Sequence, residues 1–391
     1  MPPDLDLDRD FTADEQRRER AFRSRVRPWG LAGVALGLLV PTVLVLTGAT
    51  AAVARAAGET WWLGIVAVVV VVQAVTRMAT LPGAVAVRRE SLRVGLATGG
   101  WGRWWRDLAV AWLLGLALTA PAVIGWVLAA RLLPGSWWWV VAAAAALLVV
   151  LMSFAVPVLV EPLFARFEPM PDGALRERLL ALAAEAGVPV RDVLVADASR
   201  RTTALNAYVS GLGPTRRIVV HDTLLTRGRD DEAATVVAHE LGHVVAHDVR
   251  TGTLLGAAGA SVGVLVAAAL VAWPPLLSAS GSTGAADPAV SGLLLALGAW
   301  AGFLGSPAAS ALSRRVERRA DGFCLDLARD PAAVASMHRA LAVTNLAPLR
   351  PVRVLHLWFG THPTSPERIE AARSWAARHG APSVPDLRPT A

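Results

Sequence analysis

Residues 232–249 read EAATVVAHELGHVVAHDV and follow an acidic turn in which Asp230 or Asp231 can cap a helix. On that helix His239 and His243 lie four residues apart on one face, so both imidazoles can bind one Zn²⁺. Glu240 lies beside them, where its carboxylate can take a proton from water that zinc has made more acidic. This HExxH pattern predicts a hydrolytic zinc site.

A zinc ion that works on a substrate needs a third protein ligand and an open fourth position. His247 shares the helix face but lies too far along the axis, so we expect a supporting or capping role. Glu317 in the segment RRVERRADGF is the better candidate, with Asp321 four residues later to orient His239 or His243 through a ring N–H. The alternative is that both carboxylates only pair with the neighbouring arginines.

Composition predicts a membrane protein. The chain has 391 residues, of which 54% are hydrophobic and 18% charged, and its mean hydropathy is +0.47. About 20 apolar residues cross the hydrocarbon core of a membrane. Six runs are long enough: residues 29–54, 61–81, 108–130, 137–160, 253–277 and 289–312.

The net charge of +7 comes from arginine alone, since the chain has no lysine. Arginine is abundant in residues 1–28, 82–107, 161–252 and 313–391, and scarce in residues 55–60, 131–136 and 278–288. Because basic loops stay in the cytoplasm, the HELGH segment is predicted to face it. The arginines suit membrane lipids, and we expect no nucleic-acid partner because no basic, aromatic-rich soluble domain is present.

Two further segments could contact a substrate. THPTSPERI places His362 in a turn before a proline and Arg368 in the following helix, where either could stabilise an oxyanion. ALNAYVSG is typical of a strand whose edge could pair with an extended peptide, and Asn206 could bond to that peptide's backbone. The alternatives are a turn histidine and a structural asparagine.

These segments, in this order, resemble the type 1 CAAX prenyl proteases, which are integral membrane zinc endopeptidases with bacterial homologues. The matching stretches are residues 161–190, NAY (206–208), RRIVVHDTLL (216–225), HELGH (239–243), ERRAD (317–321) and HPTSPERI (362–369). Over the membrane spans the resemblance is one of layout only. Eukaryotic members typically have seven spans, whereas six are expected here.

The resemblance implies one Zn²⁺ per chain, held by His239, His243 and Glu317, with Glu240 as general base. It further implies catalytic roles for Asp321 behind the ligands, Asn206 on the substrate backbone, and His362 and Arg368 near the scissile carbonyl. Members enclose this site in a chamber walled by helices.

We therefore expect a mainly α, polytopic membrane protein with about six transmembrane helices and a cytoplasmic-side α+β, gluzincin-like zinc protease domain split by two of them. Residues 173–186 predict a helix in that domain, and DVLVAD, ALNAYVSG and RRIVVHD predict three strands. The expected segments are a polar cytoplasmic tail (1–28), four membrane helices (29–160), the first protease part (161–252), two membrane helices (253–312) and the second protease part (313–391).

The predicted function is a membrane zinc metalloendopeptidase. An arginine-only, alanine-rich chain is typical of a GC-rich bacterial genome, where prenylated CAAX proteins need not exist. The expected substrates are therefore peptides or membrane-associated proteins, lipidated or not, at the bacterial plasma membrane. The alternatives are a heat-shock-type membrane zinc protease and a non-catalytic scaffold with structural zinc. An intramembrane protease is disfavoured because the charged residues flanking both motifs are costly to bury in lipid.

Overall fold

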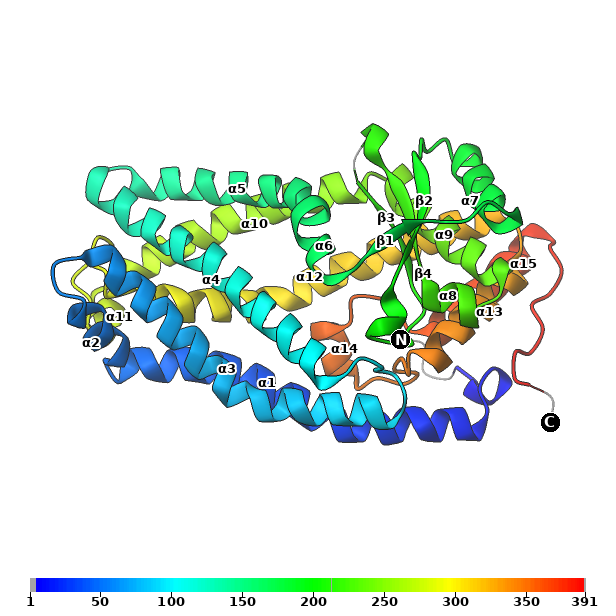
Figure 1. Ribbon diagram of the computed structural model, residues 1–391, viewed down its shortest axis with the longest axis horizontal. Helices are drawn as coiled ribbons and strands as arrows, with labels where there is room; N and C mark the ends of the chain where they lie inside the picture. Colours follow the sequence, from blue (N-terminus) through cyan, green and yellow to red (C-terminus); the bar gives the residue numbers. More distant parts are fainter. Residues whose placement is uncertain (1–4, 212, 390–391) are drawn as a thin grey trace.

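The protein, represented by a computed structural model that describes residues 5–211 and 213–389, is elongated, with long helices at one end and a small sheet at the other (Figure 1). Within these described residues, six helical segments are long and apolar enough to cross a membrane, which confirms the six predicted runs. They are α1 (Ala13–Leu46), α3 (Trp61–Arg93), α4 (Trp101–Leu132), α5 (Trp137–Ala155) with its extension to Phe164, α10 (Asp248–Val271) and α12 (Val290–Ala328).

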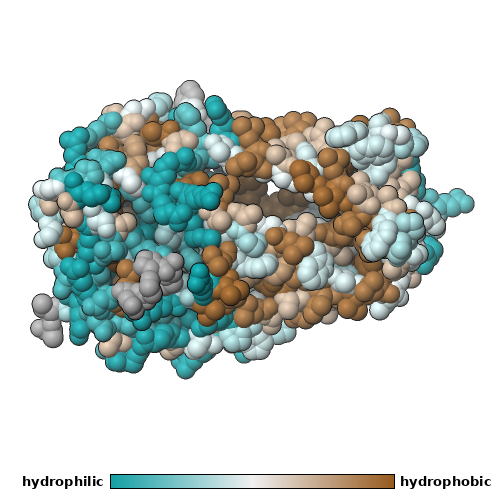
Figure 2. Space-filling view, turned by 180° about the vertical axis from the view of Figure 1, so that it is seen from behind, coloured by the Kyte–Doolittle hydropathy of each residue, from teal (hydrophilic) through white to brown (hydrophobic). Residues whose placement is uncertain are grey.

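The surface divides in the same way. Apolar side chains form a broad band over the long helices, and polar side chains cover the end that carries the sheet (Figure 2). The helical end is hollowed, and an apolar cavity of about 910 Å³ lies among α4, α5, α10 and α12. Short helices α2 (Ala49–Ala56) and α11 (Pro274–Ala279) connect the long helices at the far end.

Helix α12 is longer than the sixth predicted run. Its 39 residues, at about 1.5 Å each, extend for ~58 Å, about twice the ~30 Å thickness of the hydrocarbon core. Glu317 and Asp321 therefore lie on the continuation of a membrane helix rather than on a separate one. The fourth span also continues, through a π-helical turn (η2, Val156–Val160) into α6 (Glu161–Phe164), where Pro157 and Pro162 each lack an N–H.

The sheet has four strands in the order β1-β2-β4-β3. They are β1 (Phe167–Pro169), β2 (Asp192–Ala196), β3 (Ala207–Ser210) and β4 (Arg217–His221). The three predicted strands are present, and β1 is an additional short strand antiparallel to β2. β2 and β4 are parallel, and β3 pairs antiparallel with β4 and forms an edge.

Helices α7 (Ala174–Glu185) and α9 (Asp230–Val245) pack on this sheet and on each other, and α7 matches the helix predicted for residues 173–186. Their shared core buries Leu179, Ile218, Val237 and Leu241. A short helix, α8 (Asp222–Arg227), precedes α9.

The predicted capping of α9 is wrong in detail. Arg229 is its N-cap, and the backbone N–H of Arg229 donates to Glu232 over 3.1 Å. Asp230 and Asp231 lie within the first turn, where acidic side chains are favoured by the positive end of the helix dipole.

The C-terminal helices are α13 (Pro331–Thr344), α14 (Arg353–Phe359) and α15 (Ser365–His379), and α13 packs against α15 and α9. The N-terminal segment packs onto them: Phe11 is fully buried in a cluster with Ala335 and Ile369, and Asp10 pairs with Arg373 at 2.5 and 2.8 Å. The segment expected as a tail therefore contributes to the core of this end. Residues 1–4 and 390–391 of the expected terminal segments lie outside the described residues.

Candidate metal centre

The HELGH residues on α9 meet Glu317 on α12. The Nε2 atoms of His239 and His243 are 3.2 Å apart, and the Glu317 carboxylate oxygens lie 3.3 Å from the first and 3.6 Å from the second. A tetrahedral zinc ion with bonds of about 2.0–2.1 Å separates neighbouring ligand atoms by roughly 3.3–3.4 Å. The three side chains therefore have the spacing of a metal site.

Gly242 lets the two helices come this close. A Cβ at this position would lie 3.2 Å from Ala320 Cα and 3.1 Å from the Phe323 ring. Nearly all real Cβ contacts are longer, so a side chain here would push α12 away from α9. The glycine within HELGH thus contributes to the spacing between Glu317 and the two histidines.

A buried oxygen tests whether these residues fit a metal. Glu317 Oε2 is inaccessible to solvent and accepts no hydrogen bond within residues 5–211 and 213–389. A buried acceptor without a partner costs about 1–3 kcal/mol, and more when it is charged. A cation between Glu317 and the two imidazoles would satisfy this oxygen, so the residues present fit a divalent metal.

His239 is oriented from behind by Asp321, which it contacts through Nδ1 at 3.0 Å. Arg368 on α15 donates from Nε to both oxygens of Asp321, at 3.0 and 2.9 Å. His338 lies 3.7 Å from the same carboxylate, and complete burial holds the pKa of His338 well below its usual value, so this ring is neutral. Arg368 thus holds Asp321 through one edge of its guanidinium, while the side chain still lines the cavity of the site.

His243 is oriented by a different carboxylate, that of Asp248, which lies 2.9 Å from its Nδ1. Asp248 also pairs with Arg319 on α12. Between α9 and α10 the chain turns at His247, which has a φ of +56° and is the N-cap of α10. His247 therefore has the expected capping position, but its side chain makes no cap hydrogen bond.

Glu240 is placed beside the candidate ligands. One of its carboxylate oxygens and the ring nitrogens of His239 and His243 lie within 4.8 Å of one another. Burial raises the pKa of Glu240. Burial lowers the pKa of His239, but the carboxylates of Asp321 and Glu317 outweigh it and raise that pKa to about 9. A metal must therefore displace a proton from this cluster at neutral pH.

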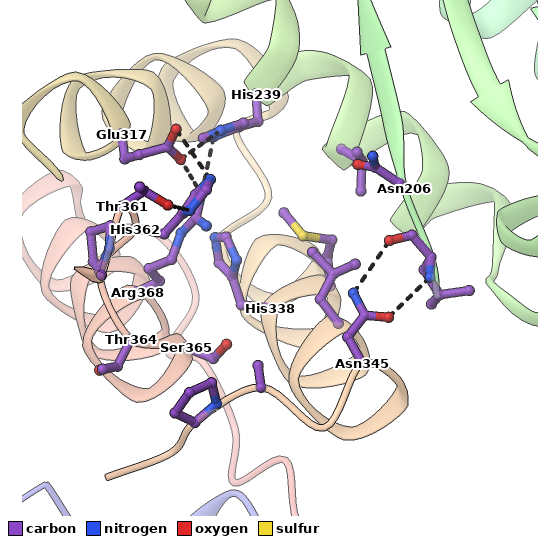
Figure 3. Close-up of a pocket in the computed structure, with 18 of the residues that line it drawn as sticks. Asn206, His239, Glu317, His338, Asn345, Thr361, His362, Thr364, Ser365 and Arg368 are labelled. Carbon is purple, nitrogen blue, oxygen red and sulfur yellow. Dashed lines mark hydrogen bonds and ion pairs between the residues drawn. The ribbon is translucent and has the colours of Figure 1, made fainter. Parts of the chain in front are cut away.

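The cluster opens into a cavity of about 430 Å³ (Figure 3). His239, Glu317, His362 and Arg368 gather on one side, and Asn206 lies across the cavity. The His362 ring is 59% exposed, lies 3.4 Å from Glu317 and contacts the Thr361 hydroxyl at 2.8 Å.

Asn206 precedes the edge strand β3, and hydrogen bonds fix its own backbone and that of the residue before it. Its carbonyl accepts from the His221 N–H over 3.0 Å. The Asn345 side chain accepts from the Leu205 N–H at 3.0 Å and donates to the Leu205 carbonyl at 3.3 Å (Figure 3). The side chain of Asn206 remains exposed toward the cavity.

Comparison with known proteins identifies the family. Residues 169–376 match the model of peptidase family M48. The chain belongs to peptidase family M48. Residues 92–166 match the CAAX prenyl protease N-terminal region, described as five membrane helices. This M48 peptidase is therefore an integral membrane metalloprotease that hydrolyses peptide bonds. The two matches confirm the resemblance to CAAX prenyl proteases and do not favour a heat-shock-type protease or a non-catalytic scaffold.

Relatives and a solved structure agree with this assignment. An uncharacterised metalloprotease of Bacillus subtilis, YhfN, is 29% identical over 345 residues, which cover 87% of this chain and 81% of that protein. A CAAX prenyl protease 1 homologue of Arabidopsis thaliana is 44% identical over 94 residues, or 24% of this chain and 22% of that protein. The crystal structure of S. mikatae Ste24p shares the fold, with a TM-score of 0.79 at 19% identity, and the match covers 95% of this chain and 91% of that chain.

The sequence did not reveal Asp248, His338 or Asn345 as parts of this region. On a continuous helix Asp248, five residues after His243, would point away from it. Only the left-handed residue His247 returns Asp248 to the imidazole, and that conformation has no clear sequence signal. His338 and Asn345 come from α13, whose packing against α9 could not be predicted from its own residues.

The orientation of His243 can be tested with Asp248→Ala. We expect the affinity of the M48 peptidase for zinc to fall about 10- to 100-fold, since a metal-binding imidazole depends on the partner of its other nitrogen. Competition with a chromophoric chelator measures this without any substrate. Asp172→Ala, at a side chain that is 97% exposed, is the matched control. An unchanged affinity in Asp248→Ala would rule out the orienting role.

Tyr208 on β3 is the only tyrosine of the chain, so its titration reports on the edge strand alone. Burial and the charge of Glu161 raise the pKa of Tyr208 to about 12, against about 10 for an unfolded chain. Because the folded pKa is the higher one, this group's stabilising contribution is complete below pH ~10 and is lost as the pH rises toward 12.

We expect the ultraviolet absorbance of phenolate to appear near pH 12 in the folded protein, and near 10 in guanidinium. In Glu161→Gln the transition should move to lower pH, because the negative charge that helps to raise the pKa of Tyr208 is removed. A folded protein that titrates like the unfolded chain would contradict the burial of Tyr208.

Proposed function

We propose that this M48 peptidase binds one Zn²⁺ through His239, His243 and Glu317 and cleaves peptide bonds with Glu240 as general base. The observation that carries the proposal is the convergence of two ring nitrogens and one carboxylate from α9 and α12, with a Glu317 oxygen buried and without a hydrogen-bond partner among the described residues. Two nitrogens and one carboxylate are the donor set of many catalytic zinc sites.

Bound zinc would supply Lewis acidity toward the peptide carbonyl and toward water. Glu240 takes the proton of the attacking water as the C–O bond forms and passes it to the amine nitrogen as the C–N bond breaks. The exposed ring of His362 is placed to donate a hydrogen bond to the carbonyl oxygen as charge develops there. Arg368 holds the Asp321 that orients His239, and its place in the cavity lining supports a position near the scissile carbonyl.

The substrate is proposed to bind as an extended chain along β3, with its backbone bonded to Asn206. The two hydrogen bonds between the Asn345 side chain and the Leu205 backbone support this mode of binding, because they fix the start of the strand that such a chain would follow. We propose peptides and membrane-associated proteins as substrates, including lipidated chains. The names of the CAAX prenyl protease relatives and the apolar cavity among the helices support lipidated ones. No nucleic-acid partner is proposed.

The proposed location is a bacterial plasma membrane with the metal site on the cytoplasmic side, supported by the arginine-rich segments. Residues 161–252 and 313–391 are proposed to form one peptidase domain, split by the two membrane helices within 253–312. The remaining segments are the N-terminal segment 1–28 and the four membrane helices within 29–160.

A peptide-library digest tests the proposed activity. The protein in detergent is stripped with a chelator, reloaded with zinc, and incubated with a diverse peptide library, and all cuts are mapped by mass spectrometry. We expect cuts that vanish on stripping and return with zinc, flanked by residues that define the substrate preference. Cuts that persist in the stripped protein, or no cuts at one zinc per chain, would contradict the proposal.

A further inference from the structure

A second cavity, of about 460 Å³, lies apart from the metal centre and shares no lining residue with its cavity. It forms where the start of α4, the α6–β1 connection and the short helix η3 (Ala198–Arg200) meet. Five arginines line it: Arg103, Arg106, Arg166, Arg200 and Arg201.

The positive charge of this arginine cavity is not balanced by the protein. Arg200 pairs with Asp197 at 2.8 Å, and Arg201 pairs with Asp107 at 2.9 Å. Arg106 is 3.4 Å from the same Asp107. With five guanidinium groups and two carboxylates, three positive charges remain.

Two of the arginines have little to bind within the protein. Arg103 donates to the neutral carbonyl of Arg200 at 2.7 Å. The side chain of Arg166 has no ion-pair or hydrogen-bond partner in the part of the chain that the structure describes, although its backbone N–H donates to Asp197 at 2.8 Å. Guanidinium groups that converge without a counter-ion favour a phosphate group, which they can bind through paired N–H donors.

The cavity is preformed because the loop between α3 and α4 docks on the loop around η3. The Thr98 N–H donates to the Arg201 carbonyl at 3.1 Å, and its hydroxyl donates to the Ser199 carbonyl at 2.6 Å. Gly99 permits this approach, because a Cβ there would lie 2.6 Å from the Arg200 carbonyl oxygen. The arginines of α4 and of η3 are thus held together by backbone contacts.

The surroundings of the cavity point to the membrane boundary. Leu163 and Phe164, at the end of the fourth span, line it beside the arginines. Trp101, Trp104 and Trp105 begin α4 in edge-to-face contact, with ring centroids 5.5 and 4.8 Å apart. Tryptophan is enriched where a membrane helix meets the headgroup layer. The cavity therefore offers cations at headgroup depth and an apolar wall next to them.

We propose that this arginine cavity binds the phosphate of an anionic phospholipid at the boundary between the membrane helices and the peptidase end. The phosphate sits among Arg103, Arg106 and Arg166, and the acyl chains leave along Leu163, Phe164 and the outer surface of α4. A free phosphate would use the same cations but would gain nothing from the apolar wall, so we assign the site to a lipid.

The test uses the full-length protein in neutral detergent micelles with increasing amounts of dioleoylphosphatidylglycerol, and native mass spectrometry counts bound lipids per chain. We expect one retained lipid that dioleoylphosphatidylcholine, in excess, does not displace. Because Arg106→Gln/Arg166→Gln removes two of the cations that face the phosphate, it should weaken retention at least about tenfold. Inorganic phosphate should not displace the lipid.

Arg27→Gln/Arg89→Gln is the matched control, since it removes two exposed arginines elsewhere on the chain. Size-exclusion elution and zinc content show whether each variant is folded. Equal lipid retention in the folded cavity variant and the control variant would overturn the proposal. Displacement by inorganic phosphate, or equal retention of phosphatidylcholine, would overturn the assignment to an anionic lipid.

Discussion

Glu240→Gln should lower the rate of peptide cleavage by at least about a thousandfold while the protein still binds one zinc ion. Glutamine keeps the size of the side chain, but its amide cannot take the proton of the attacking water or return it to the leaving amine. Burial raises the pKa of Glu240, so a neutral residue is compatible with this position and the fold should be retained. The measurement combines turnover of a peptide from the library digest with zinc content by mass spectrometry.

The control for this variant is Glu185→Gln, an exposed glutamate on α7. It should cleave at the rate of the unaltered protein. If Glu240→Gln retained more than about a tenth of the activity, the general base would have to be another residue. If it lost zinc as well as activity, the rate would no longer report on proton transfer.

Glu317→Gln should have the largest effect on metal binding. It replaces the one anionic candidate ligand, whose Oε2 is buried and accepts no hydrogen bond among the described residues, by a neutral amide that binds zinc poorly. We expect zinc affinity to fall at least about a hundredfold. This loss is larger than the one expected when a residue that only orients a ligand, such as Asp248, is removed. Activity should follow the zinc content and recover in part at high zinc concentration.

Chelator competition measures this affinity, with Glu177→Gln on the exposed face of α7 as the control. Zinc binding of normal affinity in Glu317→Gln would show that Glu317 is not a ligand, and the third ligand would then have to be sought elsewhere.

Much of the membrane region and half of the candidate site were predictable because they depend on neighbours along the chain. Hydrophobic length alone predicts the six spans. The four-residue spacing of His239 and His243 places both rings on one face of α9. The predicted boundaries were less accurate, as α12 shows, because polar residues can continue a helix that packs against other elements beyond the membrane.

The partners of the metal-site residues could not be assigned in this way. The sequence allowed Asp321 to orient either histidine, and the structure pairs it with His239. The contact of Arg368 with Asp321 could not be assigned either, because it depends on the packing of α15 against α12. The arginine cavity likewise combines residues from three separate segments, none of which forms a binding pattern by itself.

The sequence by itself determined the spans, the paired histidines with Glu240, and the identity of Glu317 as a candidate ligand. Only the tertiary structure decided which carboxylate orients which imidazole and which arginines share a cavity. Helical periodicity relates residues within one element, whereas these pairings depend on how elements approach each other. That approach rests on local features such as Gly242 between α9 and α12 and the left-handed turn at His247.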